Sequence, residues 1–515
     1  MHYILCILVL VAGISPLLTF TRLWQVKEWR YDRLREHLRH EGWFRQLFGL
    51  VKPIVVAIGI VFYLIHLPFA DDFLFDPAYI LWATSALLAW FTMFRLVVGK
   101  QARPVWTNKA LAVAVISFTL FGIVDLILCG YGWAVIILTL LPLFMFVFAG
   151  LALALLQPLD RLLKKRLITK AMRIRSKCPN LTVVGITGSV GKTTTKELLA
   201  HILSDRNILV TPAHVNTEMG VAGLMTRKLK EEKQIFIVEM GAYTRGEIGL
   251  LCSLVKPQIG VITFIGKQHL GLFGSMEDLC SAKGELFSAL PPEGHAFLNA
   301  DPEHCKELMK LADCPVHTVG TGGHATYEAF DIQESGNGVS FTVRGEQFTV
   351  PIPGTHQVTN VLLAVAVAET LGVPVAESAK RLLTMKPLPQ TFEKKEGAKG
   401  QVVLDDTHNA SPASFRAAIE WARNYTKEKK VLVTSGLLEL GKEECAIHRE
   451  LGMNARGVFD EVVFLSKKCV RSFEQGYGKT VKVFPKKKFK MALSENMLIV
   501  CEGRMPNSIV EKLLS

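Results

Sequence analysis

The chain has 515 residues, with 59 Lys+Arg against 46 Asp+Glu, 50% hydrophobic residues and a mean hydropathy of +0.29. This length leaves room for three or four units of about 100–200 residues each, and the hydropathy excludes a disordered chain and argues against a plain cytosolic enzyme. Residues 1–180 carry a net charge of +11 and the rest only +2, which argues against a nucleic-acid-binding surface on the larger part.

Five apolar segments in the first third are long enough to cross a bilayer about 30 Å thick. The first has neither the basic start nor the small-residue cleavage site of a signal peptide, so we interpret it as an anchor. We therefore expect an all-α transmembrane bundle of about five helices over residues 1–157. The segments are residues 3–20, 53–69, 79–98, 110–129 and 133–156.

The loops between these segments differ sharply in charge. Loops 21–49, 95–109 and 157–180 carry seven, four and eight Lys/Arg, whereas loops 70–78 and 130–132 carry none. By the positive-inside rule, the N-terminus lies outside and the larger part lies in the cytoplasm. The sequence thus predicts a multi-pass protein of the plasma membrane, with a basic juxtamembrane linker over residues 158–180.

Two features of residues 1–180 each have two interpretations. Asp125 lies inside the fourth segment, where a carboxylate is a functional candidate, unless it sits near the outer interface and reaches water. Segment 21–49 mixes charges with Trp24, Trp29 and Trp43, which suits an amphipathic helix on the inner leaflet or a solvated connector.

The cysteines form no recognisable framework. Ten of them are scattered along the chain without a CxxC pair or zinc-ligand spacing. We expect reduced thiols throughout.

From residue 181 onward, short apolar runs alternate with helical patterns. This alternation predicts α/β domains built on parallel sheets, whose ligands gather at the carboxyl ends of the strands. A Pro-containing, charged stretch separates two such domains, a central domain over 181–386 and a Rossmann-like domain over 401–515, with 387–400 as the linker. The apolar runs are 182–186, 235–238, 260–264, 402–404, 431–434, 462–465 and 498–500.

The strongest motif is a phosphate-binding loop at residues 185–194, which read GITGSVGKTT. Backbone N–H groups and the start of the following helix can cradle phosphates. Lys192 would pair with the outer phosphates of a nucleotide and the Thr193 hydroxyl would bind Mg²⁺. The ATP-binding candidates here are Gly188, Ser189, Val190, Gly191, Lys192, Thr193 and Thr194.

This shortened loop resembles that of the Mur ligase family, the ATP-dependent amide ligases of peptidoglycan precursor synthesis. Later motifs resemble the branch of the family that adds D-Ala-D-Ala, MurF, and together they span about 335 residues in the same order. They are NTEMGV from Asn216, EMGAYTRGEI from Glu239, HLGLFG from His269, SAKGEL from Ser281, GTHQVTN from Gly354, DDTHNASP from Asp405 and LELG from Leu438, the last followed by His448.

The resemblance assigns a role to each polar residue of the motifs. It implies catalytic positions at Lys192, Glu239, His269 and Lys283, with ATP and two Mg²⁺ ions as cofactors. Thr193 and Glu239 would bind the first Mg²⁺ and His269 the second, while Lys283 would react with CO₂ to form a carbamate that supplies oxygen near the metal.

The remaining assignments concern the nucleotide. The resemblance implies that Asn360 contacts adenine and that Asp406 and Asn409 contact ATP from the C-terminal domain. By themselves, Asn409 could be a turn residue and His356 a helix cap. In the same way, His269 could be a loop histidine and Lys283 a solvated helix charge.

Three departures from the family pattern leave ATP turnover and substrate choice open. The linker segment 387–393 reads PLPQTFE and lacks the family's arginine. His408 stands where the family has a tyrosine, and the family's KGSR segment reads CEGR at residues 501–504.

The apolar segments replace the domain with which soluble members of this branch bind the UDP-sugar. We therefore expect a membrane-anchored ligase that activates a peptide-stem carboxylate and joins it to an amino acid or a dipeptide such as D-Ala-D-Ala. The acceptor would be a lipid-linked muramoyl peptide, or a UDP-linked one if the spans only tether the enzyme to a membrane-bound assembly. The alternatives are a ligase for another envelope or poly-amino-acid substrate, and a nucleotide-binding membrane scaffold or transport component.

Overall fold

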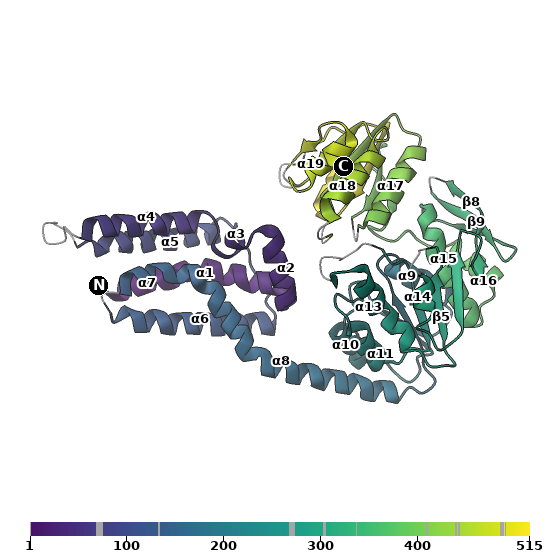
Figure 1. Ribbon diagram of the computed structural model, residues 1–515, viewed down its shortest axis with the longest axis horizontal. Coiled ribbons are helices and arrows are strands. Elements are labelled where there is room, and N and C mark those ends of the chain that lie inside the picture. The colour runs from purple at the N-terminus through teal and green to yellow at the C-terminus, as the bar shows by residue number, and fades with distance from the viewer. Residues whose placement is uncertain are drawn as a thin grey trace. The chain divides into compact units, whose positions relative to one another are not determined.

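The computed structural model describes residues 2–67, 76–131, 134–266, 273–301, 305–335, 337–407, 410–437, 440, 443–484, 489 and 491–515. It divides into two compact units, Met1–Lys164 and Lys165–Ser515 (Figure 1). The division falls inside one long helix, slightly beyond the end of the predicted transmembrane domain.

The described part of the first unit is helical. It contains α1 (His2–Val26), α2 (Tyr31–Glu41), α3 (Trp43–Phe48), α4 (Val51–His66), α5 (Ala78–Val97), α6 (Asn108–Cys129), α7 (Val135–Leu140), the 3-10 helix η3 (Leu141–Phe144) and the start of α8 (Met145–Ser176). In their described residues, all five predicted apolar segments are therefore largely helical. Four helical stretches within the described residues are long and apolar enough to cross a membrane, and the fifth, α4, is a shorter apolar helix of 16 residues.

Helix α1 contains a proline, and neighbouring polar groups compensate for it. Pro16 has no N–H to donate to the carbonyl of Ala12, and the Thr92 hydroxyl of α5 donates to that oxygen instead, at 3.3 Å. The carbonyl oxygen of Ser15, the residue before the proline, accepts from Gln101 Nε2 at 3.0 Å. Such replacement donors are what allow proline in an apolar helix.

Two cysteines of this unit correct the expectation of reduced thiols. Cys6 at the start of α1 and Cys129 at the end of α6 form a disulfide. The prediction treated every cysteine as lying in one reducing compartment, whereas both of these residues lie at the end of the bundle that the charge pattern assigns to the outside. The seven other cysteines whose side chains the structure describes are free.

The second unit begins with the end of α8, which lies in the predicted juxtamembrane linker and packs on the α/β core. The Arg175 side chain is buried and donates to the backbone oxygens of Val255 and Cys178, at 2.8 and 2.7 Å. Ala171, one turn earlier, is also buried.

A seven-stranded parallel sheet of order β2-β3-β1-β4-β5-β6-β7 forms the middle domain. Helices α9 and α15 and a three-stranded antiparallel sheet (β10-β9-β8) cover one face, and α10, α11 and α13 cover the other. The elements are β1 (Thr182–Thr187), α9 (Lys192–Ile202), β2 (Ile208–Val210), α10 (Glu218–Lys228), β3 (Ile235–Glu239), α11 (Glu247–Val255), β4 (Ile259–Ile262), α13 (Met276–Ser288), β5 (His295–Asn299), α14 (Cys305–Met309), β6 (Val316–Gly320), β7 (Tyr327–Glu328), β8 (Phe330–Ser335), β9 (Gly338–Val343), β10 (Glu346–Val350), η4 (Thr355–Gln357), α15 (Val358–Thr370) and α16 (Val375–Leu382).

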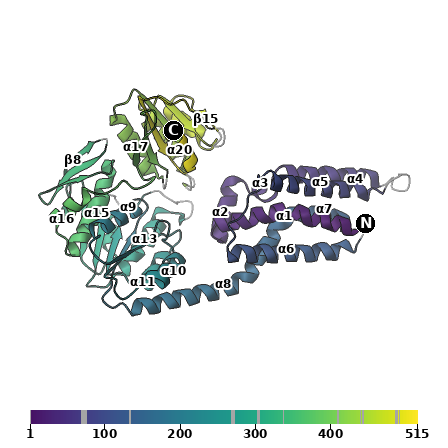
Figure 2. The same cartoon turned by 180° about the vertical axis from the view of Figure 1, so that it is seen from behind.

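The C-terminal domain has a six-stranded sheet of order β11-β12-β16-β13-β14-β15, in which only β11 is antiparallel. Helices α17, α18 and α19 pack on one face, and α20, labelled in Figure 2, packs on the other. Strand β11 lies inside the predicted linker, so the sheet starts earlier than expected. The elements are β11 (Glu393–Glu396), β12 (Val402–Asp406), α17 (Pro412–Asn424), β13 (Lys429–Thr434), α18 (Glu444–Ala455), β14 (Glu461–Phe464), α19 (Val470–Tyr477), β15 (Lys482–Val483), β16 (Met497–Glu502) and α20 (Asn507–Leu514).

This architecture confirms the predicted fold class of an apolar helical N-terminal region followed by two α/β domains. All seven predicted apolar runs lie on strands of the two parallel sheets.

Candidate active site

The predicted phosphate-binding loop lies between the end of β1 and the start of α9. Gly188 and Gly191 have φ angles of +147° and +87°, which residues with a side chain rarely adopt. A Cβ on Gly188 would lie 2.0 Å from Thr263 Oγ1, and one on Gly191 would lie 2.2 Å from Asn360 Oδ1. The backbone can therefore make this turn only with glycine at both positions.

Lys192, the first residue of α9, folds back over the loop. Its Nζ donates to the carbonyl oxygens of Gly188 and Ser189, at 2.7 and 3.0 Å. Burial lowers the pKa of Lys192, which the Glu239 carboxylate partly opposes. A bound phosphate would offer this ammonium a stronger, charged acceptor than the two carbonyls.

Glu239 ends β3 beside the first turn of α9. Its Oε2 accepts from Thr193 Oγ1 at 2.9 Å and pairs with Lys196 Nζ at 3.4 Å, and its Oε1 accepts from Asn216 Nδ2 at 3.1 Å. Burial alone would raise the pKa of Glu239, but the charges of Lys192 and Lys196 and these hydrogen bonds outweigh it, so the pKa lies below its usual value. The side chain is therefore a carboxylate at neutral pH.

Lys283 lies on α13 with only 3% of its surface exposed. Its Nζ is 5.9 Å from the centre of the Phe273 ring. Burial and the nearby charge of Lys192 lower the pKa of Lys283 to about 7, against the opposing pull of Glu247, Glu285 and Glu239. Much of this amine is thus unprotonated at neutral pH, which is the form that reacts with CO₂.

Two carboxylates hold the loop that follows Glu239. Glu285, also on α13, accepts from the backbone N–H groups of Gly246 and Gly249, at 2.6 and 2.9 Å. Glu247 accepts from the N–H of Tyr243 at 2.7 Å. The same helix therefore carries Lys283 and fixes the loop beside it.

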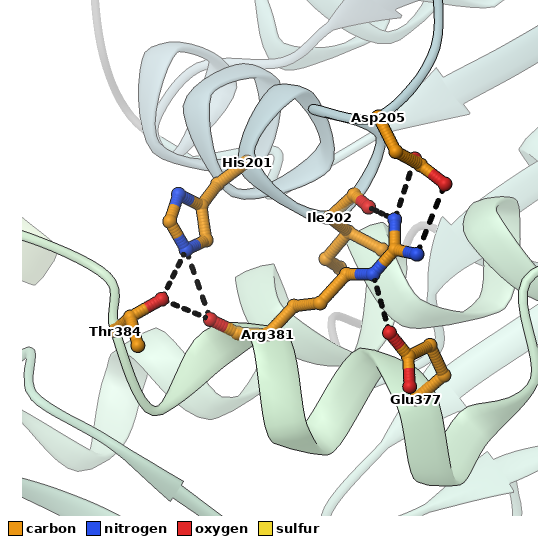
Figure 3. Close-up of polar contacts among 6 residues, drawn as sticks. All are labelled: His201, Ile202, Asp205, Glu377, Arg381 and Thr384. Carbon is orange, nitrogen blue, oxygen red and sulfur yellow. Dashed lines mark hydrogen bonds and ion pairs between the residues drawn. The ribbon is translucent and has the colours of Figure 1, made fainter.

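The far end of α9 is tied to α16 (Figure 3). Arg381 donates to the carbonyl oxygen of Ile202 and forms an ion pair with Asp205 at 2.6 Å, so a cation sits at the negative end of the helix dipole. His201 Nε2 lies 2.9 Å from the carbonyl oxygen of Arg381. The helix that begins at the phosphate loop is thus anchored at both ends.

The described residues fit a first magnesium ion. The Thr193 hydroxyl and the ionised Glu239 are adjacent, and both are hard oxygen ligands of the kind Mg²⁺ prefers. Within the described ranges there is no group of three or more His, Cys, Asp or Glu side chains placed to hold a metal, so phosphate oxygens and water would have to complete the ligand set.

The structure brings most of the predicted residues together. Residues 188–194, Glu239 and Lys283 line the loop region, and Asn360 packs on Gly191. Asp406 lies at the carboxyl edge of the C-terminal sheet. His269 and Asn409 lie outside the described residues, so their predicted roles stay predictions.

Asp406 has an acidic neighbour that sequence reasoning noticed only as a departure. It lies in register with Glu502 on the adjacent strand, and Glu502 is fully buried. Burial raises the pKa of Asp406, and burial together with the charge of Asp406 raises that of Glu502 well above its usual value. Among the described groups, no N–H or hydroxyl donates to either Glu502 oxygen, and two buried carboxyls side by side favour the protonation of one of them.

Other supporting residues were also missed as site residues. Asn216 lies inside a quoted motif, and Lys196 lies one helical turn after Lys192, so helical spacing could have found it. The loop-holding roles of Glu247 and Glu285 depend on packing between α11 and α13, which spacing does not reveal.

Two family models match the second unit. The Mur ligase middle domain matches residues 186–368, and the Mur ligase glutamate ligase domain matches residues 392–498. This chain belongs to the Mur ligase family. The predicted family is confirmed, and the two Mur ligase matches coincide with the two α/β domains of the structure.

Several relatives of this Mur ligase carry the same enzyme name. A Bacillus subtilis UDP-N-acetylmuramoyl-tripeptide–D-alanyl-D-alanine ligase is 34% identical over 274 residues, which cover 52% of this chain and 59% of the relative. The Escherichia coli ligase of the same name is 31% identical, over 55% of this chain and 64% of the relative. The chain thus spans about three fifths of the curated relatives that it matches.

Solved structures of MurF are also similar to this chain. MurF from Acinetobacter baumannii superposes with a TM-score of 0.62 at 25% identity, covering 68% of this chain and 80% of that one. MurF from Thermotoga maritima in complex with ADP has a TM-score of 0.58 at 29% identity, covering 68% of this chain and 82% of that one.

Proposed function

We propose that this chain is a membrane-anchored, ATP-dependent amide ligase of cell-wall precursor synthesis. The observation that carries the proposal is the contact between Thr193 and Glu239 at the mouth of a phosphate-binding loop, with Lys283 buried nearby. Relatives named as D-Ala-D-Ala ligases and a solved MurF that binds ADP support the same reaction class.

The reaction has two steps. The acceptor's carboxylate attacks the γ-phosphorus of ATP, a P–O bond breaks, and an acyl phosphate and ADP form. The amine of a dipeptide then attacks the acyl carbon, phosphate leaves with the C–O bond's electrons, and the amine loses its extra proton. The products are an amide, ADP and phosphate.

The chain's own residues serve the first step by position and charge. The N–H groups of the loop and the start of α9 hold the phosphates, and Lys192 moves from the loop carbonyls to a phosphate oxygen. Thr193 and Glu239 would hold Mg²⁺, which offsets the negative charge of the phosphates and the incoming carboxylate. Lys283, as a carbamate, would place a further anionic oxygen beside the metal region.

The N-terminal unit supports membrane anchoring. Exposed tryptophan and tyrosine side chains lie at both ends of its apolar helices, where the interfaces of a bilayer select them. Trp43 and Trp106 are 59% and 55% exposed at the basic end, and Tyr3 and Tyr131 are 76% and 52% exposed at the other. The basic end would face the cytoplasm together with the ligase domains.

Anchoring favours a lipid-linked acceptor. An enzyme fixed at the inner leaflet meets a lipid-linked muramoyl peptide by diffusion in two dimensions. The two Mur ligase family models match residues 186–368 and 392–498, which lie after the apolar helices. A UDP-linked acceptor, with the spans acting only as a tether, is the competing choice.

The test compares the two acceptors. The purified full chain in detergent would receive Mg-ATP, bicarbonate, D-Ala-D-Ala and a muramoyl tripeptide in UDP-linked or lipid-linked form, with Lys192→Ala as the control. Mass spectrometry should detect the extended peptide on the lipid-linked carrier. Extension of the UDP-linked form alone would overturn the lipid-linked choice, and no extension of either would overturn the ligase.

A further inference from the structure

A chain of side-chain contacts starts at the phosphate-binding turn and runs through the middle domain. Asn360 Oδ1 packs on Gly191 and accepts from Thr195 Oγ1 at 3.4 Å. Asn360 Nδ2 donates to Gln357 Oε1 at 2.8 Å, and Gln357 Nε2 lies 2.9 Å from His356 Nε2. Both Asn360 and Gln357 are buried, so water does not compete for these contacts.

The hydrogens in this chain run in one direction. Burial lowers the pKa of His356 to about 4, so its ring is neutral at pH 7 and its Nε2 can accept a hydrogen. With His356 Nε2 as the acceptor, Gln357 donates with its Nε2 and accepts from Asn360 Nδ2 with its Oε1. In this arrangement the side-chain oxygen of Asn360, not its nitrogen, lies nearest to Gly191.

The same chain continues across the linker. The His356 ring meets the Phe392 ring edge to face, with 4.7 Å between their centres. Phe392 is buried and has a φ angle of +52°, a conformation that a phenylalanine keeps only where its surroundings enforce it. Its N–H donates to Asp406 Oδ1 at 3.2 Å, and its ring packs near Trp421 of α17.

A glycine keeps the ring contact close. Gly354 has a φ angle of +101°, and a Cβ there would lie 2.5 Å from His356 and 3.1 Å from Phe392. The N–H of Gly354 donates to Glu334 Oε1 at 2.6 Å, which fixes this turn to strand β8. The backbone on both sides of the contact is thus held in place.

We propose that Phe392 and Gln357 are positioning residues: through His356 and Asn360 they hold Gly191 in the form that binds ATP. The phosphate-binding turn then adopts this form only when Phe392, at the start of the C-terminal domain, packs against His356 of the middle domain. This gives the linker, which lacks the family's arginine, an apolar means of acting on the nucleotide site. The inference rests on the proposed binding of ATP.

The experiment is a double-mutant cycle on nucleotide affinity in the full chain. Binding of a fluorescent ATP analogue with Mg²⁺ would be measured for wild type, Gln357→Met, Phe392→Leu and the double variant. We expect each single change to weaken binding about tenfold and the double change to weaken it little further, because both break the same chain. Phe473→Leu, a buried change in the C-terminal core that lies outside the chain of contacts, is the matched control and should leave affinity unchanged.

A second readout separates positioning from general destabilisation. ATP should slow hydrogen exchange of the Phe392 amide in wild type but not in Gln357→Met, although Gln357 belongs to the other domain. Two results would overturn the inference without touching the proposed ligase activity. One is a double variant whose loss of nucleotide affinity is the product of the two single losses, and the other is an equal loss of affinity in Phe392→Leu and Phe473→Leu. A wild type that binds no nucleotide would overturn the proposed function as well.

Discussion

Thr193 Oγ1 donates a hydrogen bond to Glu239 Oε2 over 2.9 Å, which joins the first turn of α9 to the end of β3. The two oxygens come from different elements, yet they meet where the phosphate-binding loop ends. A metal ion held there would contact both, and it would also face the phosphates that the loop binds.

Glu239→Gln should abolish this metal site without unfolding the domain. The amide keeps the size of the side chain and can still accept from Thr193, but it removes the negative charge that holds Mg²⁺. We expect phosphate release to fall roughly 100-fold or more, and Mg²⁺ to improve nucleotide binding much less than in wild type. Glu232→Gln, a change of the same kind at a surface side chain that is 63% exposed, should have little effect.

Lys283→Ala should remove the dependence of ligase activity on dissolved CO₂. Wild-type activity should drop in bicarbonate-free buffer and recover on adding bicarbonate, since the pKa of Lys283, about 7, leaves reactive amine at neutral pH. The recovery should strengthen from pH 6 to pH 8 as more amine loses its proton. Lys310→Ala, at an exposed lysine, serves as the control. Full activity of Lys283→Ala without bicarbonate would contradict the carbamate.

Glu502→Gln should stabilise the C-terminal domain at alkaline pH. Burial raises the pKa values of Glu502 and Asp406 in the folded state above those of the unfolded chain. The free energy of unfolding that the protonated carboxyls contribute is therefore fully present below the unfolded-state pKa of about 4. It is lost as the pH rises through the folded-state pKa values.

Thermal unfolding followed between pH 6 and pH 9 measures this effect. The midpoint of the C-terminal transition should fall with rising pH in wild type and fall less in Glu502→Gln, which should unfold about 3 °C higher at pH 8. Glu461→Gln, at a partly exposed carboxylate on β14, is the control. Identical pH profiles for wild type and Glu502→Gln would show that the pair does not share a proton.

The membrane topology predicts opposite accessibilities for the two ends of α6. Cysteines introduced as Trp106→Cys and Tyr131→Cys replace side chains that are similarly exposed, at 55% and 52%. With Cys445→Ser as background, a membrane-impermeant maleimide should label Tyr131→Cys in intact cells and Trp106→Cys only after lysis. The reverse pattern would invert the orientation, and labelling of both in intact cells would argue against a span.

Local patterns predicted the strands and the nucleotide loop because both depend on short stretches of sequence. The spacing of Gly188, Gly191 and Lys192 is a local requirement of a turn that runs into a helix, and each apolar run became a strand. Glu239 and Lys283 came from the family resemblance, and their burial and mutual charges explain why those residue types suit the place.

Contacts between distant segments could not be predicted in this way. The disulfide joins Cys6 to Cys129, and the Asp406–Glu502 pair arises because β16, the last strand, inserts beside β12. Asn360 lies next to the turn at Gly191, from which it is far apart in sequence, and its predicted contact with adenine stays a prediction. None of these pairings leaves a signal in residue spacing, because they depend on strand order and helix packing.

The central claim is that the chain uses ATP to join a muramoyl peptide to an amine, and phosphate release tests it most directly. Purified full chain with Mg-ATP and bicarbonate should release phosphate only when a muramoyl tripeptide carrier and D-Ala-D-Ala are both present, at one phosphate per amide formed, and Lys192→Ala should release none. Release that needs neither substrate, or that persists in Lys192→Ala, would contradict the account.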